Sequence, residues 1–467
     1  MCYILFCCIA RSVGFCGGLG VFSRDNRCKS LILNVLNHKI PPPPIFRGRD
    51  FAQYAYLLRS KYTYNIYIMQ RNRDFFEKLG REFLIIRNFY NFVPLKNSVT
   101  KYMSEYKHKI GITQGDTNGI GWEVIIKALS HPSVTDLFTP VVYGAKHIAE
   151  FYARGLEGVE PLHFNICNSA AEARRGKINL VECGAKDTRI EAGRATEESA
   201  KQALDALERA SADLVAGDLA AVVTAPINKE SMQKVGFGFT GHTEYFASKA
   251  EGEPLMIMCS EVLRVALQTV HIPVDKVAES LSAEKIVASL VALRHTLKQD
   301  FGVVEPRIAV LSLNPHAGDG GLLGSEEERI IRPAVQEAAK QGVLAFGPMA
   351  ADGLFAGGGY KKYDAILAMY HDQGLTPFKA LSPEGVNFTA GLSVVRTSPD
   401  HGTAFDIAGK DLADAQSMRN AIYEALDIVR RRNDYKYWSR NPLEHFEREK
   451  GRDVSMRDLQ AAVEKEE

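Results

Sequence analysis

The sequence predicts an α/β fold built around a largely parallel sheet. From Lys109 onward, short apolar runs alternate with stretches of helical periodicity. This alternation is typical of proteins in which helices cover a mainly parallel sheet. The chain has 467 residues, of which 46% are hydrophobic and 24% charged, so it is long enough for two or three domains with a large core.

The expected strands are short apolar runs bounded by glycine, proline or polar residues. They cover residues 109–113, 140–145, 220–225, 264–270, 307–313, 365–370 and 392–397. Ligands of open α/β sheets bind beyond the carboxyl ends of the strands. The residues that follow each run are therefore the first candidates for a functional site.

Three stretches between these runs are the expected helices. Residues 121–131 follow a glycine-rich loop. Residues 197–217 place alanine and leucine side chains on one face, and their last residue, Gly217, is suited to ending a helix. Residues 417–432 start at Ser417, a candidate N-cap, and finish with basic side chains.

Residues 1–102 differ in composition from the rest of the chain. They carry 16 Lys+Arg and 5 Asp+Glu, a net charge of +11, whereas residues 103–467 carry 41 and 51, a net of −10. They show neither a secretory signal nor an apolar run long enough to span a bilayer. We expect this leader to be upstream sequence translated by mistake, with the true start at Met103, and a basic accessory arm is the alternative.

The remaining composition excludes several classes of function. The net charge of the whole chain is +1, which gives no reason to expect nucleic-acid binding, and no membrane association is expected. The body keeps only Cys167, Cys183 and Cys259, without CxxC spacing, so neither a disulfide framework nor a zinc ribbon is predicted. A cytoplasmic location follows from this cysteine usage. Residues 433–467 are strongly charged and are expected to form a solvated tail.

Three histidines stand at or just beyond the ends of predicted strands. His271 follows "LRVALQTV", His316 follows "IAVLSLNP" and His371 follows "AILAMY". Imidazole suits Zn²⁺ or Co²⁺, and three protein ligands leave an open position where an ion can make a hydroxyl acidic. Hydrogen-bonded turn histidines are the alternative, and the residues alone do not decide between the two. A fourth histidine, His242, lies in the loop "FTGHTEYF".

Three further segments could bind anions or a cofactor. The loop "GITQGDTNGIGWEV" (111–124) leads into a helix whose first amides could hold an anion, although a plain strand–helix turn explains it equally well. In residues 376–398, Lys379 and Arg396 could clamp a phosphate and a carboxylate, or be merely solvated. The small residues of "PDHGTAFDIAGK" (399–410) permit close approach of a flat ligand, with a helix cap as the alternative.

Six motifs of the body occur in a characteristic order: "GITQGDTNGIGWEVIIKAL", "TAPINKE", "FTGHTEYFA", "LNPHAGDGG", "YHDQGL" and "DHGTAFDIAGK". In this order the chain resembles the 4-hydroxythreonine-4-phosphate dehydrogenase family of pyridoxal phosphate biosynthesis, from about residue 109 to 432. The resemblance implies two α/β/α domains with a cleft, as in isocitrate and isopropylmalate dehydrogenases, and a homodimer with active sites at the subunit interface. Residues 103–225 with 345–432 would form one domain, and residues 226–344 the other.

The resemblance also assigns roles to individual residues. One divalent ion (Zn, Mg or Co) would be held by His271, His316 and His371. Substrate contacts would come from His242, Thr243, Lys379, Asn387 and Arg396. Catalytic roles would fall to Asp352 and Lys379. The NAD contacts would be His401, Gly402, Thr403, Ala404 and Asp406. Thr117-Asn118 and Trp122 depart from the common Pro-Ala and Pro of relatives, which could mark a different substrate preference.

The implied reaction is the oxidation of a small phosphorylated substrate. NAD and a divalent ion would oxidise the C3 hydroxyl of 4-phosphooxy-L-threonine to 2-amino-3-oxo-4-phosphooxybutanoate. Loss of CO₂ would then give 3-amino-2-oxopropyl phosphate, on the route to pyridoxine 5′-phosphate. The alternatives are a dehydrogenase of erythronate or threonate 4-phosphate and a phosphate acyltransferase of similar architecture, which would need no metal.

Overall fold

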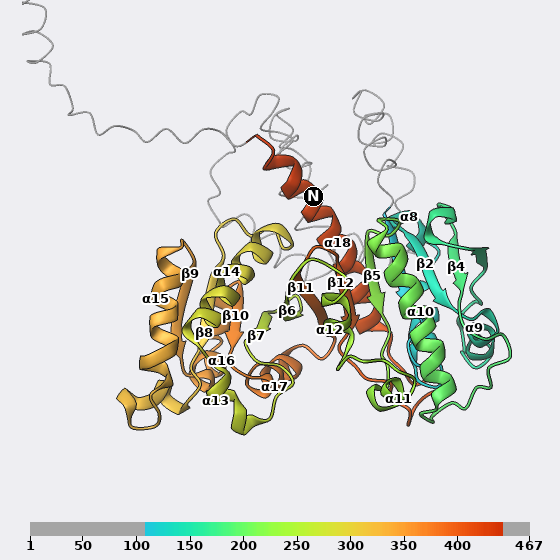
Figure 1. Ribbon diagram of the computed structural model, residues 1–467. Helices are drawn as coiled ribbons and strands as arrows, with labels where there is room; N and C mark the ends of the chain where they lie inside the picture. Colours follow the sequence, from blue (N-terminus) through green and yellow to red (C-terminus); the bar gives the residue numbers. More distant parts are fainter. Residues whose placement is uncertain (1–107, 442–467) are drawn as a thin grey trace, which may run out of the picture. The chain divides into compact units, whose positions relative to one another are not determined.

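A single sheet of twelve strands runs through the body of the protein (Figure 1). The computed structural model describes residues 108–441. The leader and the end of the charged tail therefore lie outside the described residues, and the predictions made for them stay predictions. Within the described residues, no helix combines the length and the apolarity needed to cross a membrane.

The strands occur in the sheet in the order β3-β4-β2-β1-β5-β12-β11-β6-β7-β10-β8-β9. Their bounds are β1 Lys109–Thr113, β2 Thr139–Gly144, β3 Phe164–Cys167, β4 Ile178–Glu182, β5 Ala221–Thr224, β6 Gly252–Cys259, β7 Arg264–Leu267, β8 Arg307–Leu311, β9 Leu344–Met349, β10 Ala365–Ala368, β11 Val386–Leu392 and β12 Arg396–Pro399. Only the pairs β12–β11, β11–β6 and β6–β7 are antiparallel. The predicted α/β class with a largely parallel sheet is confirmed.

One predicted strand is wrong in its bounds, and several strands were not predicted. Residues 392–397 span the turn of an antiparallel hairpin, with β11 ending at Leu392 and β12 starting at Arg396. The apolar run was continuous in sequence, but the chain reverses direction inside it. The strands missed were β3, β4, β6, β9 and most of β11, which contain Asn, Gly or Pro and so have a weak strand signal of their own.

Helices cover both faces of the sheet. Their bounds are α7 Gly121–Leu129, α8 Val134–Leu137, α9 Lys146–Ala153, α10 Glu197–Val215, α11 Lys229–Lys234, α12 His242–Ala247, α13 Val277–Ser280, α14 Ala283–Gln299, α15 Arg332–Lys340, α16 Ala351–Ala356, α17 His371–Leu381 and α18 Gln416–Trp438. The three predicted helices correspond to α7, α10 and α18. Ser417 is not the N-cap of α18: it lies inside the helix, and its hydroxyl donates to the Gly385 carbonyl.

The helix α10 shows how local sequence fixes an element. Thr196 caps its first turn, because its hydroxyl accepts from the Ser199 amide while the Ser199 hydroxyl accepts from the Thr196 amide. The predicted apolar face packs into a core cluster shared with α12 and β2. Just after the helix, Gly217 adopts a φ of +83°, a left-handed conformation that favours glycine.

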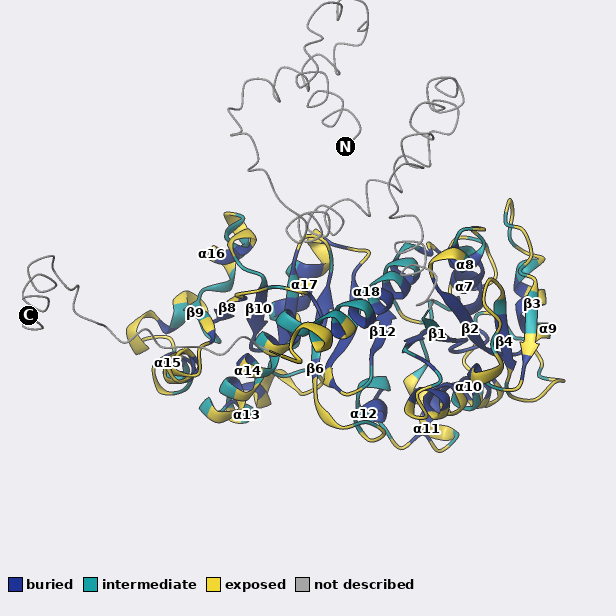
Figure 2. Cartoon of the chain, turned by 90° about the horizontal axis from the view of Figure 1, so that it is seen from above, coloured by how far each residue is buried: buried dark blue, intermediate teal, exposed yellow. Residues whose placement is uncertain are grey.

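The core lies on both sides of the strands. Figure 2 shows buried residues, in dark blue, along the strands and on the inner faces of the helices. One cluster packs α7, α14 and α18 against the sheet, and another packs α17 against β7, β8 and β10. The strands β7, β10, β8 and β9 pair with one another at one end of the sheet. The proposed two-domain division stays a prediction, and strand pairing would group residues 344–381 with β7 and β8.

Candidate active site

Two of the predicted metal ligands lie together at the carboxyl ends of two neighbouring strands. The strands β7 and β10 are parallel neighbours, so their carboxyl ends meet. His271 lies shortly after β7 and His371 begins α17 directly after β10. Their ring centroids are 6.1 Å apart. Two imidazoles on one tetrahedral ion would have centroids roughly 5 Å apart, so a small adjustment would bring both onto one ion.

A carboxylate lies against the Nδ1 atom of each of these histidines. Nδ1 of His371 is 2.6 Å from Oδ1 of Asp372, and Nδ1 of His271 is 3.9 Å from Oε1 of Glu244. A carboxylate hydrogen-bonded to one ring nitrogen favours one tautomer and leaves the other nitrogen, Nε2, to bind an ion, as at His371. At His271 the carboxylate is close but beyond hydrogen-bond distance. His271 lowers the pKa of Glu244 to about 2, so this carboxylate is ionised at neutral pH.

The third predicted ligand, His316, lies elsewhere in the described chain. It belongs to a left-handed turn, η3 (Pro315–Gly321), in which His316, Ala317 and Asp319 all have positive φ. Such backbone is costly for residues with a Cβ. Buried Glu327 stabilises the start of the turn, because Oε1 accepts from the amides of Leu313 and Asn314. In residues 108–441, no group of three His, Cys, Asp or Glu side chains could hold one ion.

Arg396 is a buried cation that forms no close ion pair among the described residues, although the negative charge of Glu244 acts on it from beyond ion-pair distance. The residue is 3% exposed. Its Nε and Nη2 atoms donate to the hydroxyl of Thr224, and Nη1 donates to the hydroxyl of Thr389. Burial lowers the pKa of Arg396 to about 9, which still leaves it charged at neutral pH. A buried guanidinium that meets only hydroxyls is suited to an anionic ligand.

The polar residues near Arg396 leave buried atoms without partners. Burial, followed by the positive charges of Arg396 and Lys229, lowers the pKa of His242 well below its ordinary value. Within the described chain, Nε2 of His242 and Oδ1 of Asn387 are buried and take part in no hydrogen bond. Asn387 and Thr389 lie on the same face of β11 as Arg396 on β12. This arrangement supports the predicted substrate contacts of His242, Asn387 and Arg396.

A cavity of about 240 Å³ opens beside the histidine pair. Its polar lining includes Thr243, Glu244, Gln268 and His271. Thr243, a predicted substrate contact, therefore faces the same space as a predicted metal ligand. The cavity lies at the carboxyl end of β7, where the topology of an α/β sheet predicts a ligand.

The two predicted catalytic residues differ in their surroundings. Nζ of Lys379, in the last turn of α17, is 3.0 Å from Oδ1 of Asp400. Burial raises the pKa of Asp400, and the nearby Lys379 lowers it in part. Asp352 is exposed in the first turn of α16. Its assignment stays a prediction, because no hydrogen bond or ion pair found in the described residues links Asp352 to the histidines.

The predicted NAD loop packs against the glycine-rich loop after β1. The amide of Ile120 donates to the Thr403 carbonyl, and a Cβ on Gly119 would lie only 2.8 Å from that carbonyl oxygen. Nε2 of His401 is buried and unpartnered within residues 108–441, while the Cα of Gly402 faces open space. Ala404 has a positive φ, and Asp406 is exposed. An orphaned ring nitrogen beside an open glycine is compatible with a bound cofactor.

The glycine-rich loop after β1 uses several of its amides within the protein. Its amides already donate within the protein: Asp116 to the Pro226 carbonyl, Gly119 to the Asp116 carbonyl and Ile120 to the Thr403 carbonyl. The amide of Asn118 donates to Oδ1 of Asp116, which also places a buried carboxylate inside the loop. The first three amides of α7, from Gly121 to Glu123, are not among these donors, so the anion site and the plain strand–helix turn both stay open as predictions.

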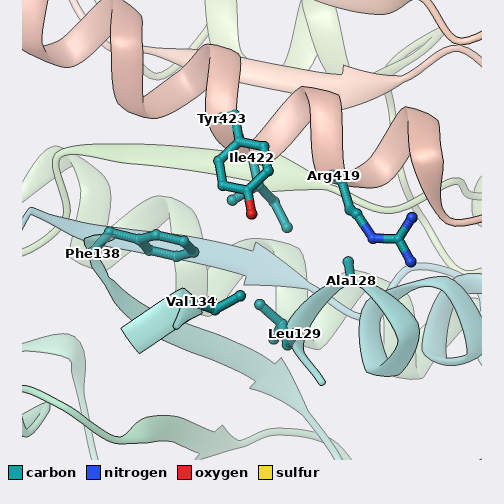
Figure 3. A pocket seen from close by; sticks show the side chains of 7 residues that line it. All are labelled: Ala128, Leu129, Val134, Phe138, Arg419, Ile422 and Tyr423. Carbon is teal, nitrogen blue, oxygen red and sulfur yellow. The ribbon is translucent and has the colours of Figure 1, made fainter. Parts of the chain in front are cut away.

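A second hollow is formed by helix packing. Figure 3 shows side chains of α7, α8 and α18 facing one another, among them Leu129, Val134 and Ile422. The hollow has no room for a water molecule. It is a packing defect between apolar helices rather than a ligand site.

Several residues of the site were not predicted. Glu244 lies inside the quoted motif "FTGHTEYF", and Gln268 inside the strand "RVALQTV". Asp400 begins "DHGTAFDIAGK", and Glu327 lies in a helical stretch after the His316 loop. Glu244, Gln268 and Asp400 could have been found from the sequence, because each is a polar residue close to a candidate site residue and is therefore a natural partner for it. Glu327 could not, because its role depends on the fold of the turn.

Comparison with known proteins identifies the family of the chain. The family model described as "Pyridoxal phosphate biosynthetic protein PdxA" matches residues 136–425. A 4-hydroxythreonine-4-phosphate dehydrogenase from Bacteroides thetaiotaomicron is 50% identical over 344 residues, which are 73% of this chain and 94% of that protein. The crystal structure of a 4-hydroxythreonine-4-phosphate dehydrogenase from Klebsiella pneumoniae superposes with a TM-score of 0.61 at 35% identity, covering 69% of this chain and 98% of its own.

A third relative carries a different name. A protein from Oceanobacillus iheyensis, provisionally named D-threonate 4-phosphate dehydrogenase, is 37% identical over 326 residues, 68% of this chain and 97% of that protein. The fold and these relatives define an oxidoreductase that acts on a CH–OH group. The chain belongs to the PdxA family of pyridoxal phosphate biosynthetic proteins. The resemblance seen in the six sequence motifs is thereby confirmed.

Proposed function

We propose that the protein oxidises 4-phosphooxy-L-threonine at its C3 hydroxyl, with NAD and a divalent ion, in the cytoplasm. The product, 2-amino-3-oxo-4-phosphooxybutanoate, would lose CO₂ to give 3-amino-2-oxopropyl phosphate for pyridoxine 5′-phosphate biosynthesis. The observation that carries this proposal is the pair His271 and His371, with Nδ1 atoms against carboxylates, at the ends of two neighbouring parallel strands. Identity of 50% to a relative named for this substrate supports the choice of substrate.

The side chains of this chain divide the work of binding. Arg396 is the buried cation for an anionic group of the substrate, and Lys379 is a second cation, held in place by Asp400. Neutral His242 offers a ring nitrogen, and Asn387 a carboxamide, to the polar groups between the two ends of the substrate. Lys379 and Asp352 are the residues we propose for moving the hydroxyl proton. Holding the substrate at several points orients the C3 hydroxyl for reaction.

A divalent ion and NAD would complete the chemistry. His271 and His371 would hold the divalent ion, and residues 401–406 would contact NAD. When bound, the ion lowers the pKa of a hydroxyl and NAD accepts the hydride. The single chain supplies only two converging imidazoles among its described residues, so a third ligand has to come from outside this group.

We propose that a second copy of the chain supplies this third ligand, His316. Exposed apolar side chains lie close to the His316 turn, with Leu322 78% exposed and Leu323 42% exposed just after it. The edge strand β9 contacts the same turn and exposes Leu344 and Phe346. Apolar side chains gathered at an unpaired sheet edge favour a protein partner. A homodimer would bury them and bring His316 to the neighbouring site.

A second candidate substrate is D-threonate or erythronate 4-phosphate. The Oceanobacillus iheyensis relative, named for D-threonate 4-phosphate, favours it, and it matches nearly the same share of this chain as several relatives named for 4-hydroxythreonine 4-phosphate. These substrates share a phosphate and a C3 hydroxyl, and they differ at C2. The residues around the hydroxyl would act alike on both.

The test is NADH formation by the purified full chain with each phosphorylated substrate, before and after treatment with a chelator. We expect turnover of 4-phosphooxy-L-threonine that the chelator abolishes and added metal restores. His371→Ala should lose at least about 100-fold in kcat/KM, whereas His163→Ala, an exposed histidine outside the site, should match the wild type. Full chelator-resistant activity, or unchanged activity in His371→Ala, would refute the proposed site.

A further inference from the structure

Two buried acceptor oxygens beside the histidine pair have no donor. Within residues 108–441, Oε2 of Glu244 and Oε1 of Gln268 are buried and accept no hydrogen bond. Both residues line the 240 Å³ cavity that also contacts His271. A buried acceptor without a donor is unfavourable, and native proteins nearly always satisfy such atoms. The two oxygens are therefore expected to meet donors that a ligand brings into the cavity.

The chemistry of the two oxygens selects the kind of donor. At the other oxygen of Glu244, Oε1, the nearest ring nitrogen is Nδ1 of His271, 3.9 Å away. None of the ion pairs found in residues 108–441 joins Glu244 to a lysine or arginine. A carboxylate and a carboxamide oxygen both accept hydrogen bonds, and together they carry a negative charge. An ammonium group, with three donors and a positive charge, is complementary to this pair.

We propose that Glu244 and Gln268 bind the C2 ammonium group of the substrate and so select an amino acid phosphate over a hydroxy acid phosphate. This inference rests on the proposed function, in which the C3 hydroxyl reacts beside His271 and His371. The ammonium group is on C2, the carbon next to the reacting C3. A group at C2 would therefore lie close to His271, and Glu244 is the carboxylate nearest to His271. Arg396, a buried cation, then takes an anionic group of the same substrate.

Discrimination follows from what a hydroxyl at C2 would lack. Threonate or erythronate 4-phosphate would offer one neutral donor to two acceptors, and one acceptor would stay unpaired. A site built to receive a polar group rejects the analogue that lacks it, because its own buried groups are then left without partners. Loss of one charge-assisted hydrogen bond typically weakens binding by about 10- to 100-fold.

The decisive measurement is the ratio of kcat/KM for 4-phosphooxy-L-threonine to that for D-threonate 4-phosphate. Gln268→Leu removes the acceptor, so we expect this ratio to fall about tenfold. Gln268→Glu adds a second charge, so we expect the ratio to rise severalfold. Met256→Leu, a change in the same cavity lining that touches no acceptor, should leave the ratio unchanged. Because the ratio compares two substrates on one enzyme, a general loss of active protein cancels.

The outcomes separate this inference from the proposed function. If both substrates are oxidised and neither Gln268 variant changes the ratio by more than about twofold, the ammonium site is refuted while the dehydrogenase function stands. A fall in the ratio with Gln268→Glu would show that the carboxamide presents its NH₂ group, which also refutes the site. A wild type that oxidises neither substrate would overturn both proposals. Should Gln268→Leu fail to fold, the nearly isosteric Gln268→Glu decides alone.

Discussion

Two buried arginines of this protein have opposite surroundings. Arg432, on α18, forms a two-point ion pair with Asp300, with Nε 2.7 Å from Oδ1 and Nη2 3.0 Å from Oδ2. Its Nη1 atom donates to the carbonyls of Leu392 and Ser393. Arg396, on β12, is equally buried but meets only the hydroxyls of two threonines. The first cation is neutralised within the fold, and the second is not.

A buried charge that serves stability has an ion-paired partner within the fold, whereas a buried charge without one is suited to binding a ligand. Burying an ion is unfavourable unless an opposite charge and hydrogen bonds compensate it. The Asp300 pair compensates Arg432, so this pair joins α14 to α18 and to the turn between β11 and β12. Arg396 has no ion-paired carboxylate among the described residues, and Glu244 offsets its charge only in part, so its desolvation is a stability cost that an anionic ligand would reduce. The following predictions test this contrast.

The largest effect is expected when the structural pair is broken. Asp300→Ala leaves the Arg432 guanidinium buried with only carbonyl partners, and we expect a loss of about 3–5 kcal/mol in the free energy of unfolding. Urea unfolding followed by circular dichroism measures it. The double variant Asp300→Ala/Arg432→Met should be clearly more stable than Asp300→Ala alone. A single variant within about 1 kcal/mol of the wild type would show that the pair is not structural.

The functional arginine should respond in the opposite way. Arg396→Met keeps the volume of the side chain and removes the unpaired charge, so the free energy of unfolding should stay the same or increase. Activity should fall, because a charge-assisted contact to the substrate is lost, by about 2–5 kcal/mol or roughly 30- to 5000-fold in kcat/KM. Steady-state kinetics and urea unfolding on one preparation measure both. An unstable but active variant would reverse the roles assigned to Arg396 and Arg432.

An anion should stabilise the protein through Arg396 alone. At a concentration of about 100 times its dissociation constant, a ligand adds roughly 2.7 kcal/mol to the stability of the folded state. Inorganic phosphate should therefore raise the melting temperature of the wild type but not of Arg396→Met. Chloride at equal ionic strength is the control for general salt effects. An equal rise in both proteins would place the anion somewhere other than Arg396.

Much of the fold could be predicted from the sequence, because most of the parallel strands and the helices α7, α10 and α18 carry their own local signals. The parallel strands β3, β4 and β9 and the helix α14 were not predicted. The strands β1, β2 and β8 have apolar centres, and α10 has both a periodic face and a helix-ending glycine. The antiparallel centre was less visible. The residues of β6 and β11 are a mixture of polar and apolar types, and their conformation is fixed by pairing with each other rather than by local preference.

The site was predictable where chemistry-bearing residues end strands, as at His271 and His371. It was not predictable where partners come together through the fold. Glu244 reaches His271 only because α12 packs near the end of β7, and Asp400 meets Lys379 across more than twenty residues of sequence. His316 shows the limit of reasoning within one chain, since the fold places it on a separate left-handed turn.

The smallest predicted effect concerns the threonine that orients the functional arginine. Thr389 is fully buried, and its hydroxyl accepts from Nη1 of Arg396 at 3.1 Å. Thr389→Val keeps the shape and removes this acceptor, so the guanidinium is held only by Thr224. Loss of this hydrogen bond should weaken substrate binding by about 0.5–1.5 kcal/mol. We therefore expect KM for the phosphorylated substrate to rise roughly two- to twelvefold, with kcat nearly unchanged. A fall in kcat at constant KM would instead mean that the orientation of Arg396 matters in the transition state rather than in binding.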